Sequence, residues 1–201
     1  MATTGEDSYR VLSRTEPFHG AIFRLRSDQV ETPAGERAQR DYLVHPGAVG
    51  VVALDGQQRV VLVRQYRHAL GRPLWEVPAG LVDIPGETLP EVAIRELAEE
   101  TDLTAGRLDL LLDLHPSPGV SDERIRIFLA RELAPTGRPH RRTHEEATMT
   151  VARFRLDRAV GMIFDGQITN GAAVAGLLAT ARARDLGWAP LRPAGAPADL
   201  E

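Results

Sequence analysis

The feature that most constrains the fold of this chain is a group of glutamates on the apolar side of an expected helix. Thr88 and Glu91 have the spacing of a capping box, and a pattern of about 100° per residue continues from there to residue 103. One side of this helix collects seven residues, which are Leu89, Val92, Ala93, Glu96, Leu97, Glu100 and Leu103. The stripe should face the core, and Glu96 and Glu100 lie one turn apart in its middle.

Two carboxylates in a core repel each other and lose their hydration. The free-energy cost of burying each charge is several kcal/mol even after the protein relaxes around it. A bound divalent cation removes this penalty, because hard cations prefer carboxylate oxygens. Glu99 lies at the edge of the stripe and can add a ligand or a supporting contact, and Arg95, one turn earlier, can pair with it. The alternative is a solvated acidic face, which predicts glutamates opposite the apolar residues rather than among them.

Composition narrows the class of protein. The chain has 201 residues, of which 43% are hydrophobic, enough for one domain or for one domain with a small accessory sheet. Its net charge of −4 supplies no broad field for nucleic acid. The absence of cysteine excludes disulfides and thiol chemistry and fits the cytoplasm. Because no run approaches the roughly 20 apolar residues of a membrane span, we expect no membrane partner.

The pattern of residues 1–45 predicts a small antiparallel β meander, with strands expected near residues 9–12, 22–30 and 38–45. A sheet of this size has too little apolar surface to stand alone. We therefore expect it to pack on the following domain or on a second subunit.

Residues 46–188 are expected to form the main domain. Two strand-like runs, residues 48–54 and 59–65, flank Asp55-Gly56, which is a strong hairpin signal. After the acidic helix we expect strands at 108–114, 124–130 and 148–155, helices at 157–164 and 170–186, and a disordered tail at 189–201. Strands on both sides of a central helix indicate an α/β fold, namely an α/β/α sandwich around a mixed central sheet, with the small N-terminal sheet added.

The stretch 80–103 also resembles a Nudix box, the signature of the Nudix hydrolases. Eight positions match the motif, namely Gly80, Glu87, Arg95, Glu96, Leu97, Glu99, Glu100 and Leu103. Two positions depart from it. Six residues rather than five separate Gly80 from Glu87, and Asp102 stands where the motif has a glycine that ends the helix in a left-handed conformation. Neither departure removes a carboxylate expected to bind metal.

The resemblance implies a fold and a chemistry. It implies the Nudix-type sandwich and metal-dependent hydrolysis of a nucleoside diphosphate linked to another group. Carried over by position, Glu96 and Glu100 are metal ligands, Glu99 is a ligand or near-ligand, and the backbone carbonyl of Ala79 completes the shell. Arg95 orients the carboxylates, and Glu87 helps to hold the loop. The implied cofactor is Mg²⁺, with Mn²⁺ as an alternative.

Three further segments, RQYR at 64–67, LWEVPAG at 74–80 and SPGVSDE at 117–123, are similar to the ADP-ribose pyrophosphatase branch, most of all to its actinobacterial members. This likeness implies cleavage of ADP-ribose to AMP and ribose 5-phosphate, and a homodimer in which the N-terminal sheet is exchanged. It places Pro118, Gly119 and Ser121 at the substrate, with Glu76 reaching it from the neighbouring subunit. The alternatives are a hydrolase of another nucleoside diphosphate sugar or dinucleotide, and a non-catalytic nucleotide sensor.

The branch takes its general base from a loop late in the chain. Glu146 occupies that position as the base or as an additional metal ligand, and Glu145 is the alternative. An acidic surface turn is the competing interpretation. Arg64 and Arg67 are candidates to clamp phosphates or to stack on a base, against ordinary solvent contacts at a strand end, and Tyr66 is a candidate wall of the substrate site.

Overall fold

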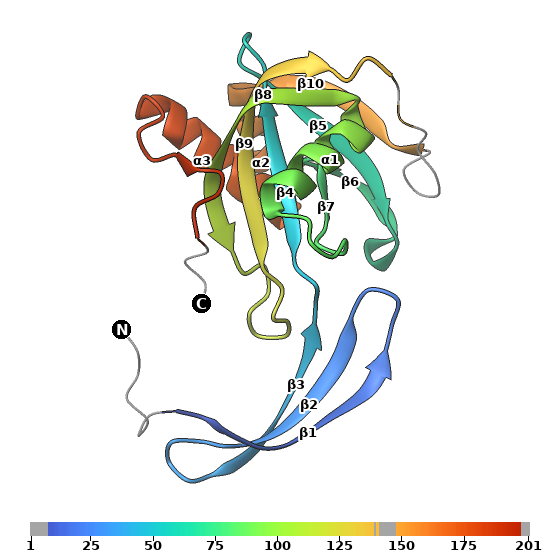
Figure 1. Ribbon diagram of the computed structural model, residues 1–201, viewed down its shortest axis with the longest axis vertical. Helices are drawn as coiled ribbons and strands as arrows, with labels where there is room; N and C mark the ends of the chain where they lie inside the picture. Colours follow the sequence, from blue (N-terminus) through green and yellow to red (C-terminus); the bar gives the residue numbers. More distant parts are fainter. Residues whose placement is uncertain (1–7, 139, 141–147, 198–201) are drawn as a thin grey trace. The chain divides into compact units, whose positions relative to one another are not determined.

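The computed structural model describes residues 8–138, residue 140 and residues 148–197. The chain forms two compact units (Figure 1). Unit 1 comprises Met1–Pro46 with Ser117–Arg124, and unit 2 comprises Gly47–Pro116 with Ile125–Glu201.

Unit 1 is a three-stranded antiparallel sheet of β1 (Arg10–His19), β2 (Arg24–Glu31) and β3 (Arg37–Val44), in that order. The buried carboxylate of Asp28 ties the three strands together, since it accepts hydrogen bonds from Arg14 at 2.7 and 2.8 Å and from the Tyr42 hydroxyl at 3.1 Å. The small N-terminal sheet expected from the sequence is therefore present.

Unit 2 is built on an eight-stranded mixed sheet. Along its main path the order is β10-β5-β4-β9-β8-β11, with β6 paired to β5 and β7 paired to β4. The strands are β4 (Ala48–Leu54), β5 (Arg59–Arg67), β6 (Arg72–Glu76), β7 (Ala79–Leu81), β8 (Leu103–Leu114), β9 (Ile125–Pro135), β10 (Thr150–Arg155) and β11 (Arg192–Pro193). The β4–β9 pair is parallel and its neighbours are antiparallel, so the sheet is mixed as expected.

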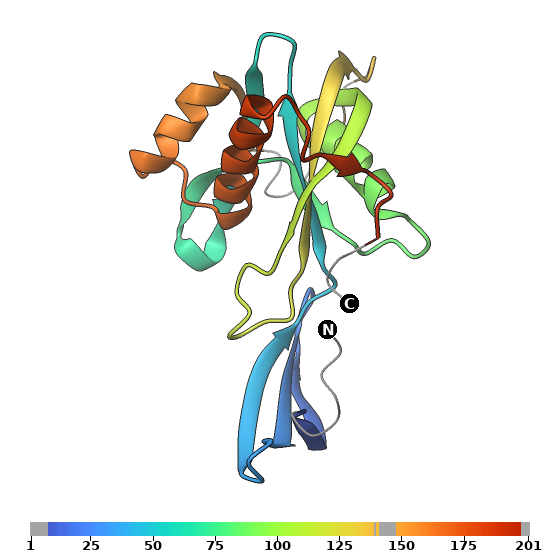
Figure 2. The same cartoon turned by 90° about the vertical axis from the view of Figure 1, so that its left-hand side faces the viewer.

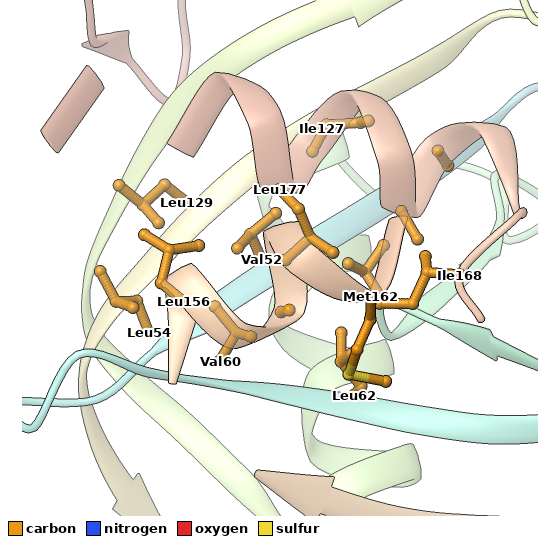
Figure 3. Packing of buried hydrophobic residues seen from close by; sticks show 14 residues of the cluster. Val52, Leu54, Val60, Leu62, Ile127, Leu129, Leu156, Met162, Ile168 and Leu177 are labelled. Carbon is orange, nitrogen blue, oxygen red and sulfur yellow. The ribbon is translucent and has the colours of Figure 1, made fainter. Parts of the chain in front are cut away.

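Helices cover both faces of this sheet. Figure 2 shows α1 (Leu89–Thr101) on one side and α2 (Leu156–Phe164) with α3 (Gly171–Asp185) on the other. Successive residues of β4 point to opposite faces, so that Val52 packs toward α2 and α3 while Val51 packs toward α1. Figure 3 shows the first of these two cores, in which Leu177 of α3 and Met162 of α2 meet the sheet. The α/β/α sandwich predicted from the sequence is confirmed.

Several elements differ from the sequence expectations. No strand was predicted between residue 65 and the acidic helix, yet residues 72–81 contain β6 and β7. Strand β8 begins at Leu103, five residues earlier than expected, because pairing with β9 extends through residues with weak strand preference of their own. The expectation of disorder from residue 189 does not hold for the described part of that segment, where β11 pairs with β8 and the Ala196 carbonyl accepts from Arg126 at 2.8 Å.

Within the described residues, no helix is long and apolar enough to cross a membrane.

Candidate active site

Helix α1 begins at the predicted capping box but ends at Thr101, two residues before the end of the predicted stripe, so that Leu103 opens β8. At the start, the Glu91 carboxylate accepts hydrogen bonds from the backbone N–H of Thr88 at 2.7 Å and from its hydroxyl at 2.6 Å. These bonds hold the pKa of Glu91 below its ordinary value. At the end, Asp102 adopts the left-handed conformation, with φ 57° and ψ 30°. An aspartate thus makes the turn that the Nudix motif gives to glycine.

Glu96 and Glu100 both face inward from α1. Glu96 is 9% exposed and Glu100 is 3% exposed, while the Glu99 side chain at the edge of the stripe is 42% exposed. The inward position predicted for the first two carboxylates is therefore confirmed. Glu100 accepts a hydrogen bond from the backbone N–H of Ala79 at 3.2 Å, so the residue predicted to offer its carbonyl lies beside this carboxylate.

The strand β7 brings Ala79 and Gly80 to the helix. Ala79 pairs with Gly50 and Gly80 with Val49, so the segment lies along the first half of β4. A side-chain carbon added at Gly80 would overlap all three atoms of the Glu96 carboxyl group. Glycine at this position leaves room for the carboxylate, which any side chain would displace.

Arg95 is the counter-charge of the site. Its guanidinium donates to Glu87 at 3.0 Å, to Glu96 at 2.6 Å and to Glu99 at 3.3 Å. The hydrogen bonds to Glu87, together with the charge of Glu96, raise the pKa of Arg95 above its ordinary value despite partial burial. Arg95 thus orients several carboxylates, as the resemblance implied, and Glu87 is held against the helix.

The chemistry of this cluster suits a cation. The guanidinium of Arg95 contacts the carboxylates of Glu87, Glu96 and Glu99, and the buried Glu100 lies on the same helix. The donors are hard oxygens, the type that Mg²⁺ and Mn²⁺ bind. Among the described residues, no group of three or more acidic, histidine or cysteine side chains is already arranged to hold a metal. The acidic groups present therefore fit a divalent cation in chemistry, and Glu96 and Glu100 are the two that are already buried.

The predicted substrate residues of β5 and β6 pair with their own neighbours. Arg67 and Glu76 form a bidentate ion pair at 2.8 and 2.5 Å, and Glu76 is 2% exposed. The guanidinium of Arg64 lies 5.9 Å from the ring centre of Trp75, and the ring of Tyr66 is 41% exposed. Substrate binding by Arg64, Tyr66, Arg67 and Glu76 stays a prediction.

The remaining predicted residues belong to the loop 117–123 and to the late loop that contains Glu145 and Glu146. Pro118, Gly119 and Ser121 belong to unit 1, where their loop pairs with β3 through Leu43, whose N–H donates to the Val120 carbonyl at 2.9 Å. Glu145 and Glu146 lie outside the described residues, so their proposed part as base or ligand also stays a prediction.

Asp102 makes a contact that the sequence reasoning did not foresee. Its carboxylate accepts a hydrogen bond from the backbone N–H of His140 at 2.6 Å. The aspartate therefore ties the end of α1 to the segment after β9. The sequence shows an aspartate in place of the motif glycine, but it does not show that the hydrogen-bond partner of Asp102 is His140, which is 38 residues away.

Comparison with known proteins identifies the family. The model of the NUDIX domain matches residues 44–172. An ADP-ribose pyrophosphatase of Mycobacterium tuberculosis is 43% identical over 188 residues, which cover 94% of this chain and 90% of that protein. An ADP-ribose pyrophosphatase of Bacillus subtilis is 33% identical over 77% of this chain and 82% of its own length.

A solved structure supports the fold. The crystal structure of an ADP compounds hydrolase superposes with a TM-score of 0.77, covering 89% of this chain and 96% of that chain at 22% sequence identity. Fold, acidic helix and sequence together define the class, and this chain belongs to the NUDIX family. It is a Nudix hydrolase, similar over most of its length to the two pyrophosphatases just described.

Proposed function

We propose that this protein hydrolyses the diphosphate of ADP-ribose to AMP and ribose 5-phosphate, with Mg²⁺ or Mn²⁺ held at α1. Two sets of facts support the proposal. The relatives from M. tuberculosis and B. subtilis carry this activity in their names, and the first is similar over 94% of this chain. The observation that carries the chemistry is the buried pair of Glu96 and Glu100 beside the backbone of Ala79.

The acidic cluster by itself repels a diphosphate. The cation would be held by the carboxylates of Glu96, Glu99 and Glu100 and by the carbonyl of Ala79, with Glu146 as a further candidate ligand. A divalent ion supplies positive charge against the phosphates and lowers the pKa of a nearby water.

The residues of the chain have separate tasks in this proposal. Gly80 leaves room for the Glu96 carboxylate, and Arg95 fixes that carboxylate together with Glu87 and Glu99. Glu146, or Glu145 in its place, takes the proton from the attacking water, which is a useful role for a glutamate only where the water is already acidified.

The proposal includes two copies of the chain. Large apolar side chains of unit 1 are exposed, including Val11 at 47%, Phe18 at 51% and Ile22 at 55%. Exposed apolar side chains of this size gather at surfaces that bind partners. A second copy that covers them would form the homodimer. In that dimer, the likeness to the ADP-ribose pyrophosphatase branch assigns Glu76, which is paired with Arg67, to the substrate of the neighbouring subunit. Measurement of the molecular mass by sedimentation tests the homodimer.

We place the protein in the cytoplasm, which its lack of cysteine fits.

The test of the substrate is a panel of ADP-ribose, ADP-sugars, NADH and diadenosine polyphosphates, each with Mg²⁺ and with Mn²⁺. Chromatography of the products should show AMP and ribose 5-phosphate from ADP-ribose as the fastest reaction. If another member of the panel were cleaved faster, that compound would replace ADP-ribose as the proposed substrate, and the proposed metal site at α1 would stand. Tight binding of ADP-ribose without hydrolysis under either metal would instead favour a nucleotide sensor.

A further inference from the structure

The residue that follows α1 holds a segment far along the chain. The backbone carbonyl of Asp102 accepts a hydrogen bond from the N–H of Thr136 at 3.0 Å, and its carboxylate accepts one from the N–H of His140 at 2.6 Å. Between these two contacts the chain passes through Gly137, which has a φ of 83°. One residue therefore fixes both ends of the segment 136–140.

The two contacts make different demands on the residue at position 102. The first contact uses a backbone carbonyl, which every residue offers. The second uses a side-chain oxygen, and the glycine of the Nudix motif has none. Asp102 also adopts the left-handed conformation and donates its own N–H to the Ala98 carbonyl at 2.9 Å, which closes α1. A glycine would close the helix with less strain, so the helix end alone does not require an aspartate.

The anchored segment leads directly into the late loop. This loop, residues 141–147, begins after His140 and contains both candidates for the general base, Glu145 and Glu146. Because the side-chain contact of Asp102 fixes the chain at His140, the stretch that lacks a fixed start is shorter than if the chain were held only at Thr136. A shorter loop costs less entropy to hold in one place.

The same residue adjoins the acidic cluster. Glu99 and Glu100 lie in the last turn of α1, and Asp102 follows two residues after Glu100. At about 1.5 Å per residue along a helix, the anchor lies within one turn of both positions. The helix that would hold the cation thus also holds the start of the loop that would supply the base. A general base acts only within hydrogen-bond reach of its proton, so a fixed spacing between helix and loop matters for turnover.

We infer that Asp102 is a positioning residue for hydrolysis, which holds the start of the late loop at the end of α1 so that the loop glutamate reaches the water at the metal site. The inference rests on the proposed function. Asp102 touches neither substrate nor cation in this role and acts only through the loop. Replacing it with glycine would restore the motif and keep the helix end, but it would release the loop from its second contact.

Limited proteolysis tests the anchor without an assay of hydrolysis. Trypsin cleaves after arginine, and Arg141 and Arg142 follow His140 directly. In the full-length protein, Asp102→Gly should be cleaved at these sites about 2- to 10-fold faster than the wild type, the factor expected for one lost hydrogen bond. Asp102→Asn keeps an acceptor oxygen and tolerates the left-handed conformation, so it should be cleaved at the wild-type rate. Gln58→Gly, which relieves a left-handed residue in another turn, is the matched control.

Steady-state kinetics with ADP-ribose and Mg²⁺ tests the positioning. Asp102→Gly should lower kcat by about 10-fold with little change in KM, since misplacing a catalytic group by about 1 Å can cost up to about 100-fold. Asp102→Asn should retain the wild-type kcat. When Glu145→Gln and Glu146→Gln are both present, Asp102→Gly should have no further effect on the residual rate, because no base is left to position.

The possible results decide between positioning and a simple helix end. The inference is overturned if Asp102→Gly is cleaved no faster than the wild type or keeps full kcat. It is equally overturned if Asp102→Asn loses as much activity as Asp102→Gly, or if the loss persists in full after both loop glutamates are replaced. A wild-type protein that hydrolyses no nucleotide would refute the proposed function and the positioning role with it, whereas the trypsin rates would separately show whether Asp102 anchors the loop.

Discussion

The two polar sites of unit 2 lie along the same strand and are built in different ways. At the candidate active site, the carboxylates of Glu96, Glu99 and Glu100 come from one helix, together with the arginine that orients them. The second site is a cavity of about 290 Å³ beside the turn between β4 and β5, which we call the hairpin pocket, and its residues Gln58 and Arg131 come from separate segments that meet only in the folded chain. The difference shows that a site on one element is visible as sequence spacing, whereas a site assembled from several elements is not.

The two sites also differ in how buried polarity is balanced. At α1, Arg95 and the backbone of Ala79 hold buried carboxylates in place. In the hairpin pocket, Arg107 and Arg131 share the carboxylate of Asp109, and among the described residues the side-chain oxygen of Gln58 and the Nε of Arg131 make no hydrogen bond. The first arrangement suits a divalent cation.

The largest expected effect is on turnover at α1. We expect Glu96→Gln and Glu100→Gln each to lower turnover by more than about 100-fold, since removing groups that merely support metal ligands already costs about 10- to 100-fold. Glutamine at 100 can still accept from Ala79, so the fold should persist. Product release from ADP-ribose with Mg²⁺ measures the loss. Glu91→Gln is the matched control on the outer face of the same helix, and near-normal turnover in either inward variant would refute the metal site.

Arg95→Lys tests whether the arginine at the candidate active site orients the carboxylates of α1. Lysine keeps the charge but cannot hold Glu87, Glu96 and Glu99 together through a planar fork. We expect turnover to fall by about 10- to 100-fold, as for other groups that orient metal ligands. Arg184→Lys is the control, because Arg184 also bridges two carboxylates, those of Asp157 and Asp185, at the surface of unit 2. Equal effects of the two substitutions would show that Arg95 has no special role.

Gly80→Ala tests the close approach of β7 to α1. The added carbon overlaps the Glu96 carboxylate, so the variant should lose about 1–3 kcal/mol of stability, as overpacked sites do, and should lose activity as well. Urea unfolding measures the first effect. Gly161→Ala, in α2, meets no atom within 4 Å and should gain about 0.5–1 kcal/mol. A fully active Gly80→Ala protein would show that turnover does not need the Glu96 carboxylate in its described position.

The smallest expected effect compares two left-handed residues. Gln58→Gly should raise the free energy of unfolding by up to about 1 kcal/mol, because it relieves the backbone and removes an unsatisfied oxygen. Asp102→Gly relieves the same conformation but loses the hydrogen bond from His140. We therefore expect it to be neutral or destabilising by about 1 kcal/mol. Denaturant unfolding of both variants decides whether strain at the hairpin pocket is uncompensated.

The sequence predicted the regular parts of the fold well where local chemistry acts alone. The turn at Asp55-Gly56 joins β4 and β5 as expected, and Asn170 caps α3 by accepting from the Ala173 N–H at 2.9 Å. Strand β7 and the first residues of β8 were not foreseen, because partner strands rather than their own residues hold them in the sheet. The same reason places β11 against β8 in a segment that looked disordered.

What the sequence determined by itself was the acidic stripe of α1, since helical spacing places Glu96 and Glu100 among apolar neighbours and the capping box marks where the helix begins. What only the tertiary structure decided was which distant groups meet those residues and each other. The Glu96 carboxylate above Gly80, the Arg67–Glu76 ion pair and the hairpin pocket all depend on strand register and on backbone twist. Those are properties of contacts between segments, and no short stretch of sequence encodes them.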